Sequence, residues 1–211
     1  MTDASPDRNP AWPVELRGVT ESVVTTRGPN DRWNVAALGL HAGDPVTAVT
    51  WGDTRTRRNF EREGAGYVHF VRDPELFVTA ALDVHEVENP RLDAADARVE
   101  VEVDRIDAAT VEGTRRERWA LRPVASDVER RVVPTTNRGY SAVVEATVAA
   151  SRLDVDAYDT ATLVGRLRYF ESVVDRCGGT PERRAFDRLT ALTDWKSLDV
   201  DGDPSGQNES F

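Results

Sequence analysis

The stretch Trp51–Leu82, WGDTRTRRNFEREGAGYVHFVRDPELFVTAAL, combines a strand end, two helix starts and a concentration of arginine. It follows the apolar, strand-like residues 46–51. Gly64 predicts the end of a short polar turn or helix, and residues 67–71 predict a second strand. Asp73-Pro74-Glu75 then predicts a helix start, because Asp caps, Pro suits the first helical position and Glu suits the positive end of the dipole.

Residues 54–59 place two hydroxyls, one amide and three arginines at the start of a predicted helical turn. Free backbone N–H groups at a helix start, flanked by hydroxyls and guanidinium groups, suit a phosphate monoester. The pattern therefore predicts a phosphate-binding site, although no glycine-rich P-loop signature accompanies it. The sequence leaves a second interpretation open, in which these arginines form a solvated face that pairs with Glu61, Glu63 and the acidic surface.

The charge balance restricts the partners that we expect. The chain has 211 residues, 37 acidic and 27 basic, with a net charge of −10 and a single lysine, Lys196. Such an acidic, lysine-poor composition resembles that of halophilic proteins, in which salt screens the repulsion between carboxylates. Binding to nucleic acids or anionic membranes needs positive charge, so we expect no nucleic-acid and no membrane partner.

Cysteine and histidine usage argues against disulfide and metal sites. The single cysteine, Cys177, excludes an intrachain disulfide and a thiolate zinc cluster, and we expect it to be a packed thiol. His69 lies within a predicted strand and is expected to be packed or hydrogen-bonded rather than to bind a metal. No apolar run approaches the roughly 20 residues of a membrane span. The polar start, MTDASPDRNP, does not have the pattern of a signal peptide, so we expect a cytoplasmic protein.

The first two thirds of the chain predict a small barrel. Residues 1–15 are expected to form a flexible N-terminal arm, on which Trp12 is the residue to dock. Short turns join three strands into a meander, which is typical of small barrels, and two strands follow later. Besides the strand at residues 67–71, the predicted strands cover residues 16–26, 33–40, 46–51, 98–104 and 111–122. The helix that begins at Asp73 is expected to plug one end of this barrel, to which we assign residues 16–134.

The pattern changes after Pro134. Helices are predicted at residues 141–153, at residues 160–177 and from residue 180 to residue 192 or 195, with apolar stripes at helical spacing and glycines at a helix end. We assign residues 135–196 to a helical C-terminal subdomain and residues 197–211 to a disordered acidic tail. The fold class is therefore α+β, a mostly antiparallel, Greek-key-like barrel followed by helices.

This order resembles the FMN-binding split β-barrel of flavin reductase-like proteins, and more closely the archaeal domain-of-unknown-function 447 family. The match extends from about residue 16 to residue 195, and no single motif within it is specific. The residues that carry it are 21–26, 33–39, 54–59, 73–77 and 137–139, with Glu145 and Arg152. His69 departs from the family pattern, which has an asparagine in the strand before Asp73, and this puts an amide contact to the flavin in doubt.

The resemblance implies a flavin site. It implies that Thr54, Arg55, Thr56 and Asn59 hold the phosphate of FMN, and that Asn34, Val35 and Ala36 run beside the isoalloxazine ring. Arg138 has two interpretations, a contact to the phosphate or a substrate anion and a salt bridge with the acidic surface. The resemblance also implies a homodimer, because split barrels of this class bind flavin at a dimer interface.

Two classes of function follow from this resemblance. In the first, the protein is a flavin-dependent oxidoreductase that takes hydride from a reduced nicotinamide nucleotide or a similar small donor. In the second, it is a non-catalytic FMN-binding or carrier module, or a dimeric scaffold. No catalytic triad or metal constellation is recognisable in the sequence, so the catalytic residues are unknown at this stage.

Overall fold

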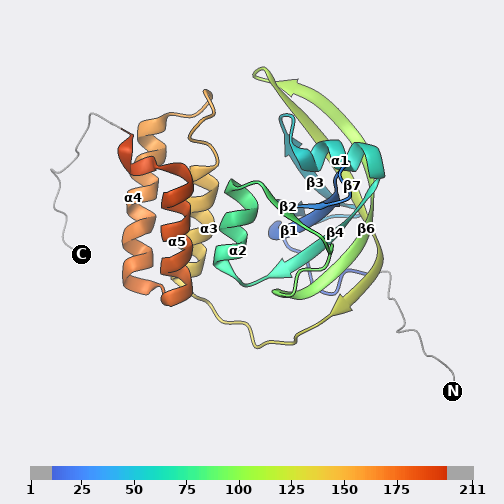
Figure 1. The fold of residues 1–211 in the computed structure, drawn as a ribbon, viewed down its shortest axis with the longest axis horizontal. Coiled ribbons are helices and arrows are strands. Elements are labelled where there is room, and N and C mark those ends of the chain that lie inside the picture. The colour runs from blue at the N-terminus through green and yellow to red at the C-terminus, as the bar shows by residue number, and fades with distance from the viewer. Residues whose placement is uncertain (1–10, 199–211) are drawn as a thin grey trace.

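The computed structural model describes residues 11–198, so the parts of the expected arm and tail in residues 1–10 and 199–211 lie outside the described chain. Within it, an antiparallel barrel is followed by a helical bundle (Figure 1). The strands are β1 (Val19–Arg27), β2 (Trp33–His41), β3 (Val46–Trp51), β4 (Ala65–Val71), β5 (His85–Val87), β6 (Ala95–Val111) and β7 (Thr114–Val128). The helices are α1 (Arg55–Glu63), α2 (Pro74–Leu82), α3 (Arg138–Ala150), α4 (Thr160–Cys177), α5 (Thr180–Thr193) and the 3-10 turn η1 (Trp195–Ser197).

Six strands close the barrel in the order β1-β4-β6-β7-β3-β2, because β1 pairs with both β4 and β2. All of these described pairings are antiparallel. Alternate residues of each strand point inward and pack as the barrel core, as a period of two requires. That core consists of Val24, Leu38, Leu40, Val46, Ala48, Phe60, Val68, Val99, Val101, Val103, Trp119 and Leu121. The predicted α+β split-barrel fold is confirmed.

The barrel splits at β2. One edge of β2 pairs with β1 along the whole strand, whereas the other edge meets β3 only at Leu40 and His41. β5, which the sequence did not predict, pairs with β2 at residues 33–35. Residues 36–39 therefore have no partner strand besides β1 within residues 11–198. An unpaired strand edge presents backbone donors and acceptors that a ligand can use.

α1, and not α2, covers the end of the barrel. Phe60 of α1 belongs to the barrel core, and its ring centroid lies 5.5 Å from that of Trp119. α2 lies between the barrel and the α3–α5 bundle (Figure 1), where its Phe77 packs with Val23 and Val35 of β1 and β2. The expectation that the helix after Asp73 plugs the barrel is therefore wrong. This helix is apolar on two faces because it is packed between two layers.

β6 and β7 form one long hairpin, whereas the sequence predicted two shorter strands at residues 98–104 and 111–122. Their pairing runs from Ala97↔Val128 to Val111↔Thr114. The turn residues Glu112 and Gly113 have φ of 49° and 79°, which a tight hairpin turn requires. The turn end of the hairpin projects from the barrel (Figure 1), and most side chains in this turn end are exposed. With no buried face there, the alternation that marks a strand in the sequence disappears.

The three C-terminal helices pack with α2 around an apolar core. Their starts follow local capping chemistry, since Asn137 caps α3 and Asp159 caps α4 with side-chain oxygens. The bounds of α4 match the sequence prediction, and those of α3 and α5 lie close to it. Ser197 belongs to η1 and Leu198 packs against the helical core, so the boundary that we expected at residue 196 falls inside this packing. At the N-terminal end of the described chain, Trp12 packs edge-on against Phe70 of β4.

Candidate functional site

The first turn of α1 presents the positive end of a helix without a carboxylate of its own. Thr54 is the N-cap, and its hydroxyl accepts a hydrogen bond from the backbone N–H of Arg57 at 3.2 Å. Arg55 and Thr56 lie between them, so this described turn contains no acidic residue. The first N–H groups of a helix lack intrahelical partners, and together with the helix dipole they favour an anion at this end.

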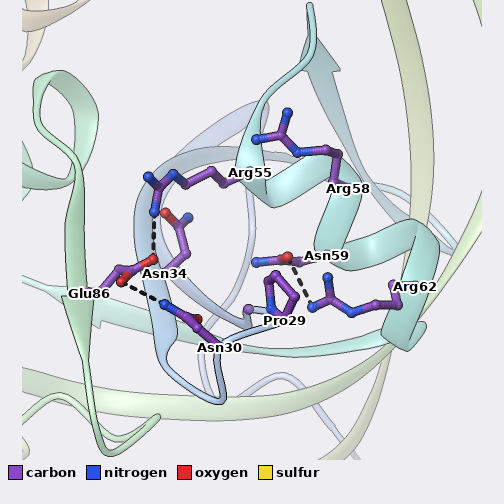
Figure 2. A pocket seen from close by; sticks show the side chains of 9 residues that line it. Pro29, Asn30, Asn34, Arg55, Arg58, Asn59, Arg62 and Glu86 are labelled. Carbon is purple, nitrogen blue, oxygen red and sulfur yellow. Dashed lines mark hydrogen bonds and ion pairs between the residues drawn. The ribbon is translucent and has the colours of Figure 1, made fainter.

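A pocket of about 340 Å³ lies beside this turn (Figure 2). Residues of the β1–β2 turn, β2, α1 and β5 surround it. They are Gly28, Pro29, Asn30, Asn34, Arg55, Arg58, Asn59, Arg62 and Glu86. Three guanidinium groups and three side-chain amides face a single carboxylate within the described lining. The pocket lining is therefore rich in hydrogen-bond donors, and basic groups outnumber acidic ones within it, although the chain as a whole carries −10.

The structure brings three of the predicted site residues, Asn34, Arg55 and Asn59, to this pocket. Two others support them. The hydroxyl of Thr54 caps the helix, and Thr56, which is only 5% exposed, accepts a hydrogen bond from Asn34 Nδ2 at 3.4 Å. The two threonines thus position the helix start and an amide and do not line the pocket themselves.

The amide of Asn59 is oriented in the same way. Its Nδ2 donates to the hydroxyl of Thr26 on β1 at 3.0 Å, and its Oδ1 accepts from Arg62 at 3.1 Å. Asn59 is 3% exposed, so packing and hydrogen bonds together restrict its rotamer. A buried amide held by two partners is a preorganised part of the pocket wall.

Each arginine of the pocket pairs with an acidic neighbour. The pairs are Arg55–Glu86 at 2.5 Å, Arg58–Asp53 at 2.8 Å and Arg62–Glu63 at 2.7 Å. The arginines therefore pair with acidic residues, as the second interpretation of the sequence expected, and they also line a pocket. A guanidinium group has five N–H donors, so these pairs leave donors for a ligand.

Arg57 points away from this pocket and connects α1 to the barrel wall. It is 7% exposed and donates to Asp53 at 2.6 Å and to Glu61 at 2.8 Å. It also lies 3.8 Å from Glu117 of β7, which is fully buried and pairs with Arg115. The hydrogen bond from Arg57 lowers the pKa of Asp53 below its ordinary value. This ion-pair cluster fixes the helix that carries the pocket arginines.

The structure does not bring the other predicted contact residues to the pocket. Val35 is buried against Phe77 on α2, and Ala36 packs against the barrel core. Arg138 is exposed at the first residue of α3, which lies in the bundle beyond α2 (Figure 1). Within one chain, therefore, Arg138 does not line the pocket beside α1.

The sequence analysis also missed part of the lining. Arg58 and Arg62 follow Arg55 by three and seven residues, which is the spacing of one helical face, so helical periodicity could have identified them. Gly28, Pro29 and Asn30 lie in the short turn between β1 and β2, for which the sequence analysis expected no binding role. Glu86 had no local signal, because it reaches the pocket through the three-residue strand β5.

His69 is packed between strands and does not line the pocket. It is fully buried, and its Nδ1 lies 3.3 Å from the carbonyl oxygen of Val23. Burial lowers the pKa of His69 to about 4, against the opposing effect of the Val23 carbonyl. The imidazole is therefore neutral near pH 7, and the prediction of a packed, hydrogen-bonded histidine is confirmed.

Among residues 11–198, no three metal-ligating side chains come together. Cys177 is half-buried against the helical core, as expected for a packed thiol. No helix in the described chain combines the length and apolarity needed to span a bilayer.

Comparison with protein families gives matches over most of the chain. Residues 20–130 match the N-terminal domain of DUF447, a protein of unknown function, and residues 137–191 match the second DUF447 domain. No curated protein sequence matches the chain.

Solved structures with the same architecture include an FMN-bound DUF447 protein from Methanosarcina mazei. It is 24% identical, with a TM-score of 0.72 over 84% of this chain and 96% of that one. A flavoredoxin from Methanosarcina acetivorans is 11% identical, with a TM-score of 0.40 over 59% and 79% of the two chains. The styrene monooxygenase flavin reductase of Pseudomonas putida S12 is 13% identical, with a TM-score of 0.38 over 55% and 83%.

Proposed function

The chain belongs to the DUF447 family, and from this premise we propose that it binds FMN, with the flavin phosphate in the pocket beside α1. One observation carries the proposal: three arginines and three amides line a pocket beside a helix whose first turn has no carboxylate. The FMN-bound Methanosarcina mazei protein of the same family supports the choice of this ligand.

The pocket residues fit a phosphate monoester. Arg55 and Arg58 offer charge-assisted hydrogen bonds, and backbone N–H groups of the α1 start add the dipole contribution. A volume of about 340 Å³ lies within the range of roughly 300–1,000 Å³ that is typical of small-ligand sites. The carboxylate of Glu86 opposes an anionic ligand. Within the lining, three positive groups face this one negative group. Arg58 and Arg62 also pair with Asp53 and Glu63, and their remaining donors can bind the phosphate.

We assign the isoalloxazine ring to the unpaired edge of β2 at residues 36–39. This edge begins two residues beyond Asn34, and a strand advances about 3.3 Å per residue, so the edge and the pocket adjoin. Its small residues Ala36, Ala37 and Gly39 allow a flat ring to approach the backbone closely. Backbone N–H groups there would donate to the ring edge that becomes negative on reduction. The ring site therefore extends further along β2 than the predicted residues Asn34, Val35 and Ala36.

We further propose that the protein is a flavin-dependent oxidoreductase and uses a reduced nicotinamide nucleotide or a similar donor. FMN, when bound, supplies the hydride-accepting chemistry. The chain's own residues hold the phosphate, orient the ring and exclude water from one of its faces. A homodimer belongs to this proposal, and a contact of Arg138 with the phosphate, if it forms, would come from the other subunit.

Titration with FMN and with riboflavin, which lacks the phosphate, tests the assignment of the pocket. Arg55→Gln is expected to raise the Kd for FMN by about tenfold or more, since a charge-assisted hydrogen bond contributes about 1.5–3 kcal/mol. The Kd for riboflavin should stay within about twofold, because the ring and ribityl contacts remain. Arg184→Gln, an exposed arginine on α5, is the matched control and should leave both Kd values unchanged. Equal losses for both flavins would refute the phosphate assignment.

The oxidoreductase proposal needs its own measurement. Protein purified in molar salt is supplied with FMN, and the oxidation of NADH or NADPH is followed by absorbance. Turnover that falls with Arg55→Gln would support the enzyme. Tight FMN binding without turnover would instead favour a non-catalytic carrier, and failure to bind FMN would refute both functions.

A further inference from the structure

The carboxylate of Glu86 already occupies donors of the pocket that we assign to the phosphate. Its Oε1 accepts a hydrogen bond from Arg55 Nη1 at 2.5 Å, and its Oε2 accepts one from Asn30 Nδ2 at 3.2 Å. Figure 2 shows both contacts converging on Glu86 at one side of the pocket. Arg32 Nε lies 3.8 Å from the same carboxylate. An anion from the chain itself therefore holds groups that would bind an anionic ligand.

The fold holds Glu86 in this position. β5 pairs with β2 at residues 33–35, and Arg32 Nη2 donates to the backbone carbonyl oxygen of Glu86 at 3.2 Å. The Glu86 side chain is 22% exposed, whereas the next acidic residue, Glu88, is 89% exposed. The partly buried carboxylate is less screened by solvent than an ordinary surface ion pair, so its interaction with Arg55 has an energetic consequence.

We infer that Glu86 is an internal competitor of the phosphate, because a phosphomonoester that takes the Nη1 donor of Arg55 and the amide of Asn30 must first displace the Glu86 carboxylate. This inference rests on the proposed function and names the regulation of that same site. A phosphomonoester carries about −1.5 to −2 charges at pH 7, whereas a carboxylate carries −1, so the dianion displaces Glu86 and singly charged anions do so poorly. Competition of this kind favours phosphomonoesters over singly charged anions, and it also lowers the affinity for the phosphomonoesters themselves. The lower affinity would make FMN an exchangeable ligand.

A different role for Glu86 would have the opposite consequence. A carboxylate can also accept hydrogen bonds from the hydroxyls of the ribityl chain, which FMN and riboflavin share. In that role Glu86 would strengthen the binding of both flavins. The two roles therefore predict changes of opposite sign when the charge is removed.

The test compares the variant Glu86→Gln with the wild-type protein. This substitution keeps the size of the side chain and an oxygen for Asn30, so β5 should stay in place. Competition predicts that the Kd for FMN falls by about tenfold, since a charge-assisted bond to Arg55 no longer has to be exchanged. The Kd for riboflavin should change by less than about twofold. The dissociation rate of FMN, measured by stopped-flow fluorescence, should fall with the Kd.

Glu88→Gln is the matched control, because it removes the same charge two residues away on an exposed side chain. An equal gain in FMN affinity in this control would show that the gain comes from the lower net negative charge and not from the contact with Arg55, and it would overturn the inference. The gain from Glu86→Gln should also vanish in an Arg55→Gln background, where the contested donor is missing. A gain that persists there would likewise overturn it.

The remaining outcomes are also decisive. Weaker binding of both flavins by Glu86→Gln would assign the residue to the ribityl chain and refute the competition. If the variant has a lower unfolding temperature than the wild type, Glu86→Asp replaces it. This change keeps the charge but withdraws the carboxylate from Arg55, and the same gain for FMN alone is expected. Wild-type protein that fails to bind FMN would refute the proposed function itself, a result independent of any change at Glu86.

Discussion

The barrel with α1 and the helical bundle bury different kinds of side chain. The buried polar residues of the described barrel part are Ser22, Thr25, Thr26, Asn34, Thr50, Thr56, Arg57, Asn59, His69 and Glu117. Those of the described bundle are Thr147 and Glu182, and both are satisfied locally. The Thr147 hydroxyl donates to the Val143 carbonyl at 2.7 Å, and the Glu182 carboxylate accepts from the Gly179 N–H at 2.8 Å.

This difference separates a binding region from a packing region. Burying polar groups is costly unless they are hydrogen-bonded, and apolar side chains would stabilise the barrel more simply. Several of the buried polar groups, such as Asn34 and Asn59, lie in or directly behind the candidate pocket. We therefore expect substitutions in the bundle to change stability alone, and substitutions in the barrel part to change binding as well.

The largest expected effect is that of Leu167→Ala in the core of the bundle. Leu167 is fully buried, so its truncation should lower the free energy of unfolding by about 3 kcal/mol, as measured by urea denaturation. FMN affinity per folded molecule should not change. Leu40→Ala, which truncates an equally buried leucine beside the split in β2, is the matched variant and should lower both quantities. Loss of FMN affinity in Leu167→Ala would break the distinction between the two regions.

The second prediction concerns the pH dependence that His69 imposes on the barrel. Its pKa is about 4 in the folded protein and about 6.5 when unfolded, so between these values the unfolded chain binds the extra proton. Stability from the neutral imidazole is therefore present above pH 6.5 and is lost as the pH falls toward 4. The loss should be about 3 kcal/mol, from roughly 1.4 kcal/mol per pKa unit. Urea denaturation at several pH values measures this loss. Between pH 6.5 and 4 the free energy of unfolding should fall less steeply with pH in His69→Gln than in the wild type, and identical pH dependences would contradict the prediction.

Third, Arg57→Met should weaken the attachment of α1 to the barrel. It removes one partner of the buried Glu117, which keeps Arg115, and should lower the free energy of unfolding by about 2 kcal/mol. FMN should bind several-fold more weakly, because α1 carries the pocket arginines. Arg118→Met, on an exposed residue of β7, is the control and should change stability by less than about 0.5 kcal/mol. Unchanged FMN binding would show that the cluster only stabilises the fold.

The smallest expected effect is that of Glu182→Ala in the bundle. Its carboxylate accepts from the Gly179 N–H at the start of α5, and loss of such a cap should lower the free energy of unfolding by about 1 kcal/mol. Thermal unfolding would detect this change, whereas FMN titration should show none. A clear effect on FMN affinity would indicate that the bundle contributes to the site.

Local signals predicted most of the helices and strands. Gly64 ends α1 and Asp73 begins α2, and both act through hydrogen bonds to residues close by in the chain. The end of α1 and the start of α2 could therefore be located from the sequence. β5 escaped prediction because three residues are too few to show a period. The long β6–β7 hairpin was predicted too short because its exposed end has no buried face to impose alternation.

For the candidate site, the sequence predicted the turn that carries it but only part of its lining. Asn34, Arg55 and Asn59 were identified through residue chemistry and family resemblance, and the structure brings them to one pocket. The directions of the arginines could not be predicted in the same way. Arg55 and Arg57 are two residues apart, about 200° around a helix, so one faces the pocket and the other faces Glu117.

By itself, the sequence determined the order of the longer strands and helices, the capped helix starts and a concentration of arginine beside one of them. These features depend on interactions within a few residues, which a linear sequence records directly. Only the tertiary structure decided that the barrel splits at β2, that α1 covers its end, and that Glu86 contacts Arg55 across 31 residues of chain. Such contacts depend on how the strands close, because burial and pairing between distant segments leave no periodic trace in either segment alone.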